Sequence, residues 1–142
     1  MRRLLPYNPD LARLVLRLAL AAVLLYHGIP KLMDFGATAV GFEGLGLPAP
    51  PVTAVIALLA EVGGGLLILL GLAVDIAGLL VIIDMLGAIV LVHWANGFDF
   101  TKGGWEHPFT VLAMALTLAL AGPGRLTVGK QHYQGAERRR RG

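Results

Sequence analysis

The feature that most constrains this chain is a series of four apolar segments, at residues 11–33, 52–72, 74–94 and 105–121. A helix needs about 20 residues to cross the hydrocarbon core of a bilayer, with a range of about 17–25. The fourth segment lies at the lower limit of that range. Only 15% of the residues are charged, whereas soluble domains carry about 25%. We therefore predict an all-α fold, an integral membrane four-helix bundle embedded in the lipid bilayer.

Basic residues gather at both ends of the chain. They precede the first apolar segment at Arg2, Arg3 and Arg13, and they follow the last at Arg125, Lys130 and 138–141. Excess Lys and Arg marks the cytoplasmic side of a membrane protein, so we expect both termini to be cytoplasmic. This gives a cytoplasmic segment at 1–10, a bundle at 11–124 and a basic cytoplasmic tail at 125–142. No basic–aromatic pattern suggests nucleic acid as a partner.

Two connections are predicted on the outer side. Residues 34–51 are rich in Gly and Pro, and their Leu and Phe content suggests a segment at the membrane interface rather than a free loop. Residues 95–104 form the second outer loop. Trp94 and Trp105 flank it, at the depth where aromatic anchors are typical. A tight inner turn is expected at 71–73.

Ionisable residues lie inside the apolar segments, where lipid normally disfavours them. They are His27, Lys31, Glu61 and Asp84. A charge at bilayer depth costs about 2.5–3.5 kcal/mol on insertion scales, so such residues usually pair inside a bundle and mark function. The alternative is a static ion-pair network that only fixes the register of the helices.

Helical spacing shows which of these residues can meet. At 100° per residue, Arg13, Arg17, His27 and Lys31 fall within an arc of about 80° on one face. Glu61 lies on a face of small residues that permits close helix packing. A His–Glu or Lys–Glu pair would offset the cost of each charge. We therefore take His27, Lys31 and Glu61 as the candidate catalytic residues.

Three further residues are candidates for substrate binding: Arg17, Asp84 and Glu106. Asp84 lies near mid-depth and is assigned inward. His93 follows nine residues later, which places it on the opposite side of a regular helix, so we treat it as an interface residue. This phase argues against a haem held by His27 and His93. No metal site is predicted, and a chain without cysteine cannot ligate an iron–sulfur cluster through thiolates.

Four motifs follow one another along the chain: Leu16-Arg17-Leu18 with Tyr26-His27-Gly28-Ile29-Pro30-Lys31-Leu32, residues 61–72 beginning Glu61-Val62-Gly63-Gly64-Gly65, Gly104-Trp105-Glu106-His107-Pro108, and Gly122-Pro123-Gly124-Arg125. In this order they resemble the motifs of the DoxX family of membrane proteins. The resemblance covers roughly residues 11–128. It implies a four-helix protein of the bacterial or archaeal cytoplasmic membrane and a loose association with oxidoreduction. Carried over by motif, it points to Arg17, His27, Gly28, Lys31, Glu61, Gly64, Glu106 and Arg125. Asp84 matches none of these motifs.

Three functions fit these observations. A quinone-linked oxidoreductase, or the membrane subunit of a redox complex, would use the cation, imidazole and carboxylate to bind a quinone and to move its protons. It would need a soluble or membrane redox partner protein. A scaffold for soluble redox enzymes would use the polar core only for structure. A transporter of protons or small solutes would use the polar stripe as a path, and so narrow a bundle would then call for a homodimer.

Overall fold

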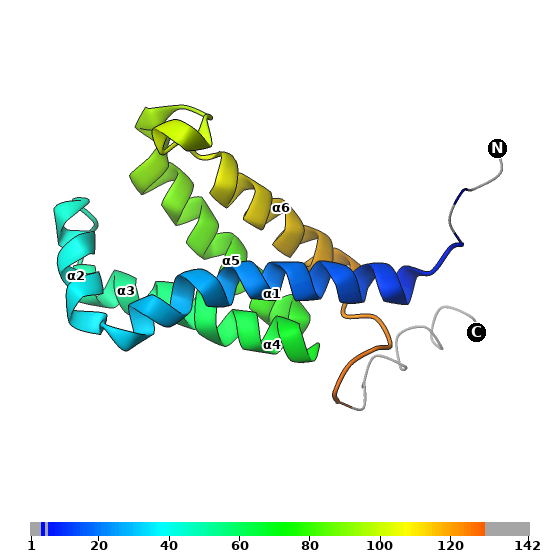
Figure 1. The fold of residues 1–142 in the computed structure, drawn as a ribbon. Helices are drawn as coiled ribbons and strands as arrows, with labels where there is room; N and C mark the ends of the chain where they lie inside the picture. The colour runs from blue at the N-terminus through cyan, green and yellow to red at the C-terminus, as the bar shows by residue number, and fades with distance from the viewer. Residues whose placement is uncertain (1–3, 5, 130–142) are drawn as a thin grey trace.

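The computed structural model describes residue 4 and residues 6–129 (Figure 1). The described residues are helical or irregular and contain no strand. Arg2, Arg3 and the predicted basic tail beyond residue 129 lie outside the described residues. The all-α prediction is confirmed. Three helices have the length and apolar composition to cross a membrane, and a shorter fourth completes an arrangement consistent with a four-helix bundle.

The bundle consists of four successive helical spans, which we call its legs, and they lie close to the predicted segments. The first is α1 (Pro9–Met33), and its N-cap Asn8 accepts a hydrogen bond from the Leu11 amide at 3.0 Å. The second leg consists of α3 (Pro50–Leu58), η1 (Leu59–Gly64) and α4 (Gly65–Leu70). The third consists of α5 (Val74–Gly87), η2 (Ala88–His93) and η3 (Trp94–Asn96). The fourth is α6 (Glu106–Ala121). The turns η1 and η2 are π-helices, which interrupt the second and third legs.

The predicted outer segment at 34–51 differs from expectation, because much of it is a helix, α2 (Phe35–Gly44). Asp34 caps this helix by accepting a hydrogen bond from the Ala37 amide at 2.9 Å. None of the residues of α2 is buried. The Gly and Pro content obscured the helix in the sequence, since the helix ends before Pro48 and contains three glycines of its own.

Small residues bring the legs together, as the sequence predicted. In the core, α1 packs against η1, α4 and α6, while α5 packs against α6 and η1. A Cβ atom at Gly64 would lie 3.2 Å from Val81 Cγ2, and one at Gly78 would lie 3.2 Å from the Ala115 carbonyl oxygen. These close approaches surround an apolar core of Leu, Ile, Val, Ala and Met side chains.

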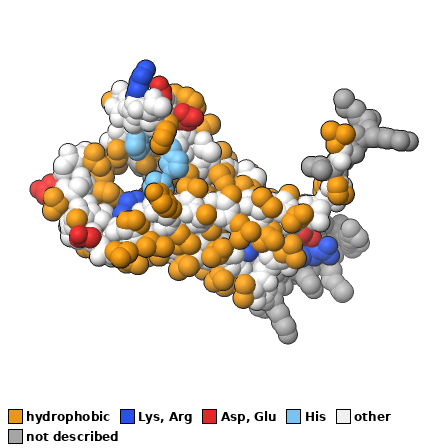
Figure 2. Space-filling view, viewed as in Figure 1, with side chains coloured by type: hydrophobic (Ala, Val, Ile, Leu, Met, Phe, Trp, Pro, Cys, Tyr) orange, Lys and Arg blue, Asp and Glu red, His pale blue; other side chains and the backbone are white. Residues whose placement is uncertain are grey.

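The bundle has two distinct ends. At the terminal end, both ends of the described chain lie at the same end of the bundle as the turn between α4 and α5 (Figure 1). At the loop end, α5 and α6 diverge from α1 and α2 in the same view. A space-filling view shows a hollow there, and the pale-blue histidine side chains gather beside it (Figure 2). The even number of legs places both ends of the described chain on one side, and which side is cytoplasmic stays a prediction.

Candidate functional site

The centre of the candidate site is an ion pair between α1 and η1. Lys31 Nζ lies 2.5 Å from both carboxylate oxygens of Glu61. The Glu61 side chain is 7% exposed and the Lys31 side chain 26% exposed. Of the two partners that the sequence allowed for Glu61, the structure shows Lys31. A carboxylate so deeply buried needs this cation, because an unpaired charge in a low-dielectric interior is strongly disfavoured.

Local backbone features bring the two charges together. Glu61 lies within η1, where the π-helical turn interrupts the regular succession of side chains. Gly28 of α1 faces this turn, and a Cβ atom there would lie 2.7 Å from Val62 Cγ2 and 2.9 Å from Glu61 Cβ. Only glycine permits this approach without displacement of η1. Gly28 therefore sets the distance between α1 and the carboxylate.

Asp84 belongs to the same charged neighbourhood. It is half-buried on α5 and interacts electrostatically with both Glu61 and Lys31. The inward assignment made from its depth is therefore supported by the structure. One lysine then faces two carboxylates from two other legs, which leaves the cluster with an excess of negative charge when all three are ionised.

His27 lies one helical turn before Lys31 and has a different neighbour from the one predicted. Its ring centroid is 5.1 Å from that of His107, at the start of α6, and 5.4 Å from that of Tyr26. The two imidazoles line a groove of about 350 Å³ together with Tyr26, Ala22 and Val23. The sequence analysis missed His107 as a site residue. Its only signal was the position immediately after Glu106 in the third motif.

His93, which the sequence analysis assigned to the membrane interface, lies at the end of η2 next to the loop. It is half-buried, and its ring nitrogen Nδ1 lies 2.7 Å from the Gly103 carbonyl oxygen, to which an Nδ1–H donates. It also interacts electrostatically with His107. The phase argument assumed 100° per residue, which does not hold through the π-helix η2. Within the described residues, no three His, Cys, Asp or Glu side chains are placed to share a metal ion.

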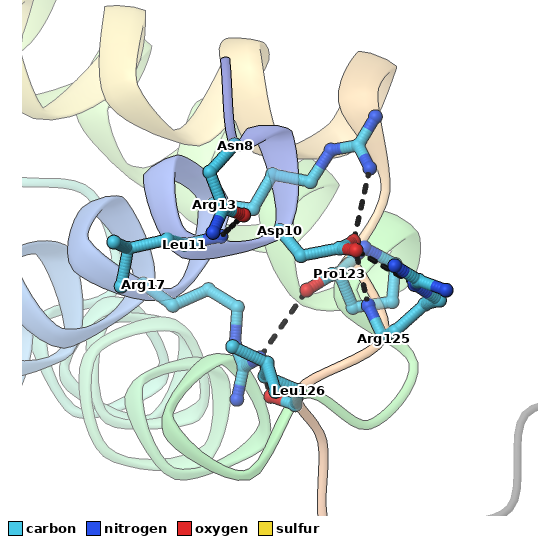
Figure 3. A network of polar contacts seen from close by, with 8 residues as sticks. All are labelled: Asn8, Asp10, Leu11, Arg13, Arg17, Pro123, Arg125 and Leu126. Atoms are coloured by element: carbon cyan, nitrogen blue, oxygen red, sulfur yellow. Dashed lines mark hydrogen bonds and ion pairs between the residues drawn. The ribbon is translucent and has the colours of Figure 1, made fainter. Parts of the chain in front are cut away.

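Arg17 lies at the terminal end, away from the ion pair, and is 1% exposed. Its guanidinium donates hydrogen bonds to backbone carbonyl oxygens on two sides: to Ile68 at 2.8 Å and Leu69 at 2.7 Å, where α4 ends, and to Pro123 at 3.2 Å and Leu126 at 2.6 Å after α6. Figure 3 shows the bond to Pro123 beside Asp10, Arg13 and Arg125. A cation at a helix C-terminus is favoured by the helix dipole.

Asp10 connects the start of α1 to the segment after α6 at this end. Its carboxylate accepts hydrogen bonds from the Arg125 amide at 3.0 Å and from Arg125 Nε at 2.7 Å (Figure 3). The hydrogen bond that Arg125 donates to this carboxylate raises the pKa of Arg125 above its usual range. Arg125, one of the residues to which the resemblance points, therefore has a structural partner here.

Glu106 opens α6 at the loop end and is exposed. Its Oε2 accepts a hydrogen bond from the Phe100 amide at 3.2 Å, which ties the loop between η3 and α6 to the start of the helix. The structure thus groups the sequence-predicted residues in three places. Lys31, Glu61 and Asp84 form the charged cluster, His27 and Glu106 lie at the loop end with His107, and Arg17 is separate.

The fold and the site define a class: a multi-pass helical membrane protein with a buried ion pair and an imidazole-lined groove at one end. The DoxX family model matches residues 12–94, and the chain belongs to this family. It is 29% identical over 126 residues to "Inner membrane protein YphA" of Escherichia coli (strain K12). The alignment covers 83% of this chain and 88% of that relative.

Two other relatives show how broad this family likeness is. "Putative oxidoreductase CatD" of Bacillus subtilis (strain 168) is 29% identical, with 89% of this chain and 90% of the relative covered. "Uncharacterized membrane protein Rv3486" of Mycobacterium tuberculosis (strain ATCC 25618 / H37Rv) is 35% identical, with coverages of 82% and 78%. No solved structure matches the chain. Two of these three names describe a membrane protein, and the third describes a reaction class.

Proposed function

We propose that this protein is a quinone-linked oxidoreductase of the prokaryotic cytoplasmic membrane, acting alone or as the membrane subunit of a redox complex. The observation that carries the proposal is the buried Lys31–Glu61 pair, one helical turn from the imidazole of His27. The names of two relatives, one an inner membrane protein and one an oxidoreductase, support the location and the reaction class.

The chemistry of a quinone matches these groups. Reduction of a quinone to a quinol takes up two electrons and two protons, and both carbonyl oxygens accept hydrogen bonds throughout. An ammonium and an imidazole can donate those bonds, and an imidazole or a carboxylate can pass protons to the reduced ring. The electrons would come from a reduced partner protein or a soluble reductant, since the chain itself has no cysteine with which to hold an iron–sulfur cluster.

A continuous polar path for transport is less well supported. The predicted stripe on α1 ran from Arg13 to Lys31, but the guanidinium of Arg17 is saturated by four carbonyl bonds within it. A solute that followed the stripe would have to break those bonds. The geometry therefore favours a site at the loop end over a path through the bundle.

The test is quinone binding by the full-length protein in lipid nanodiscs, with decylubiquinone as the probe and quenching of tryptophan fluorescence as the readout. Trp94 and Trp105 stack at 6.1 Å between ring centroids at the loop end and provide the signal. Wild type should bind above the background of empty nanodiscs, and Glu61→Gln should lose binding. Glu43→Gln, an exposed carboxylate on α2, is the matched control. Equal binding by Glu61→Gln and Glu43→Gln would overturn the site, and no binding by wild type would overturn the function.

A further inference from the structure

The groove between α1 and α6 is polar at one end and apolar along its length. His27 and His107 lie at the end nearer the loops, while Ala22 and Val23 lie about one turn deeper along α1. Within the described residues, neither imidazole makes a hydrogen bond. Their nitrogens are therefore available to a ligand, in contrast to Nδ1 of His93, which is bound to the loop.

This groove opens on the side of the bundle as well as at its end. Tyr26 is 78% exposed, and Ala22 and His27 are also exposed. The hollow beside the histidines is visible on the surface at the loop end, where α5 and α6 diverge from α1 and α2 (Figure 2). Because α1 has the length and composition of a membrane span, a side opening at this depth faces lipid rather than water. A ligand can therefore reach the imidazoles from within the bilayer.

We infer that this groove binds a lipid-soluble quinone, with one ring oxygen at the imidazoles of His27 and His107 and its apolar tail along α1 past Ala22. A neutral imidazole presents one donor and one acceptor, so the pair can bind that oxygen in either the quinone or the quinol. Tyr26, edge-on to His27, adds an aromatic wall. The inference rests on the proposed function and deepens it, because it assigns ring binding to His107 and tail binding to the side opening.

The experiment compares two quinones that share a head group, ubiquinone-0 without a tail and decylubiquinone with one, in the nanodisc assay. His107→Leu should weaken both by about tenfold, the loss expected for one hydrogen bond to a buried ligand, and His107→Gln should restore most of that loss. Ala22→Phe should weaken decylubiquinone by about tenfold and leave ubiquinone-0 unchanged. Ala19→Phe, on an exposed position of α1 outside the groove, is the matched control.

The outcomes separate this inference from the function on which it rests. If Glu61→Gln abolishes binding while His107→Leu binds both probes like wild type, the inference is overturned and the proposed function stands. If Ala22→Phe and Ala19→Phe bind decylubiquinone equally, the tail does not follow the groove and the inference is likewise overturned. If wild type binds neither probe, both proposals fail. Circular dichroism and thermal unfolding of each variant show that a loss of binding is not a loss of fold.

Discussion

Each end of the bundle holds a cation, Arg17 fully buried and Lys31 partly buried, and the two cations are paired in different ways. At the terminal end, Arg17 is surrounded by four backbone carbonyl oxygens from two separate segments. At the loop end, Lys31 meets a single carboxylate, with a second nearby and an open groove one turn away. The first arrangement uses four of the five N–H donors of the guanidinium for the fold. The second lies one helical turn from two imidazoles that make no hydrogen bond within the described residues and line a groove.

This difference separates structure from function within one chain. Carbonyls at a helix end need donors, so Arg17 stabilises the turn after α4 and the segment after α6 at once. A buried ion pair contributes little stability compared with apolar packing of the same volume. Folding therefore explains the terminal end, while for the Lys31–Glu61 pair we propose that it serves a ligand. The following predictions test that contrast, from the largest expected effect to the smallest.

Replacement of Arg17 should produce the largest loss of stability. Arg17→Met removes the donors of four carbonyl groups in a buried site, and we expect a loss of about 4–5 kcal/mol in the free energy of unfolding. Denaturant unfolding in mild detergent measures it. Arg13→Met is the control, since its side chain is 34% exposed and lies 3.6 Å from Asp10, and exposed pairs contribute at most about 1 kcal/mol. A similar effect of both variants would contradict the structural role of Arg17.

Removal of one partner of the ion pair should cost less. Lys31→Met leaves the Glu61 carboxylate buried without its cation, and we expect a loss of about 2–4 kcal/mol because Lys31 is partly exposed. The double variant Lys31→Met/Glu61→Leu should regain most of this loss, since no charge then remains unpaired. Thermal unfolding of the two single variants, the double variant and wild type gives the coupling energy. Additive losses would show that the two side chains do not act as a pair.

A methyl group at Gly28 should displace η1 from α1. Gly28→Ala would place Cβ 2.7 Å from Val62 Cγ2, and overpacking of this kind costs about 1–3 kcal/mol. The matched control is Gly87→Ala, where nothing lies within 4 Å of the added atom, and the better helix propensity of alanine should be neutral or slightly stabilising. If both variants unfold at the wild-type temperature, the close approach of α1 and η1 is not rigid.

The smallest effect is expected at Asp10. Asp10→Asn loses the ion pair with Arg125 but keeps an oxygen that can accept the Arg125 amide hydrogen bond. Because Arg125 is 91% exposed, solvent screens the pair and stability should change little. Thermal unfolding at low and at high salt checks this expectation. A large loss that salt abolishes would show that the terminal end also depends on charge.

Much of the fold follows from hydrophobic length and small-residue spacing. The four legs lie near the predicted segments, and Glu61 meets Lys31 because both occupy inward faces at similar depth. The features that helical spacing does not reveal have two physical causes. The π-helices η1 and η2 break the constant angle per residue on which side-chain directions were predicted. The roles of Arg17 and His107 depend on partners far along the chain, 51 residues away for the Ile68 carbonyl, which helical spacing does not reveal.

One measurement tests most directly the claim that the loop end serves a ligand rather than the fold. The double variant Lys31→Leu/Glu61→Leu replaces the pair by apolar side chains and is assayed for both unfolding and decylubiquinone binding in nanodiscs. The account predicts that it unfolds at or above the wild-type temperature, since apolar packing replaces a buried pair without loss, and that it no longer binds the quinone. A double variant that binds like wild type would contradict the account.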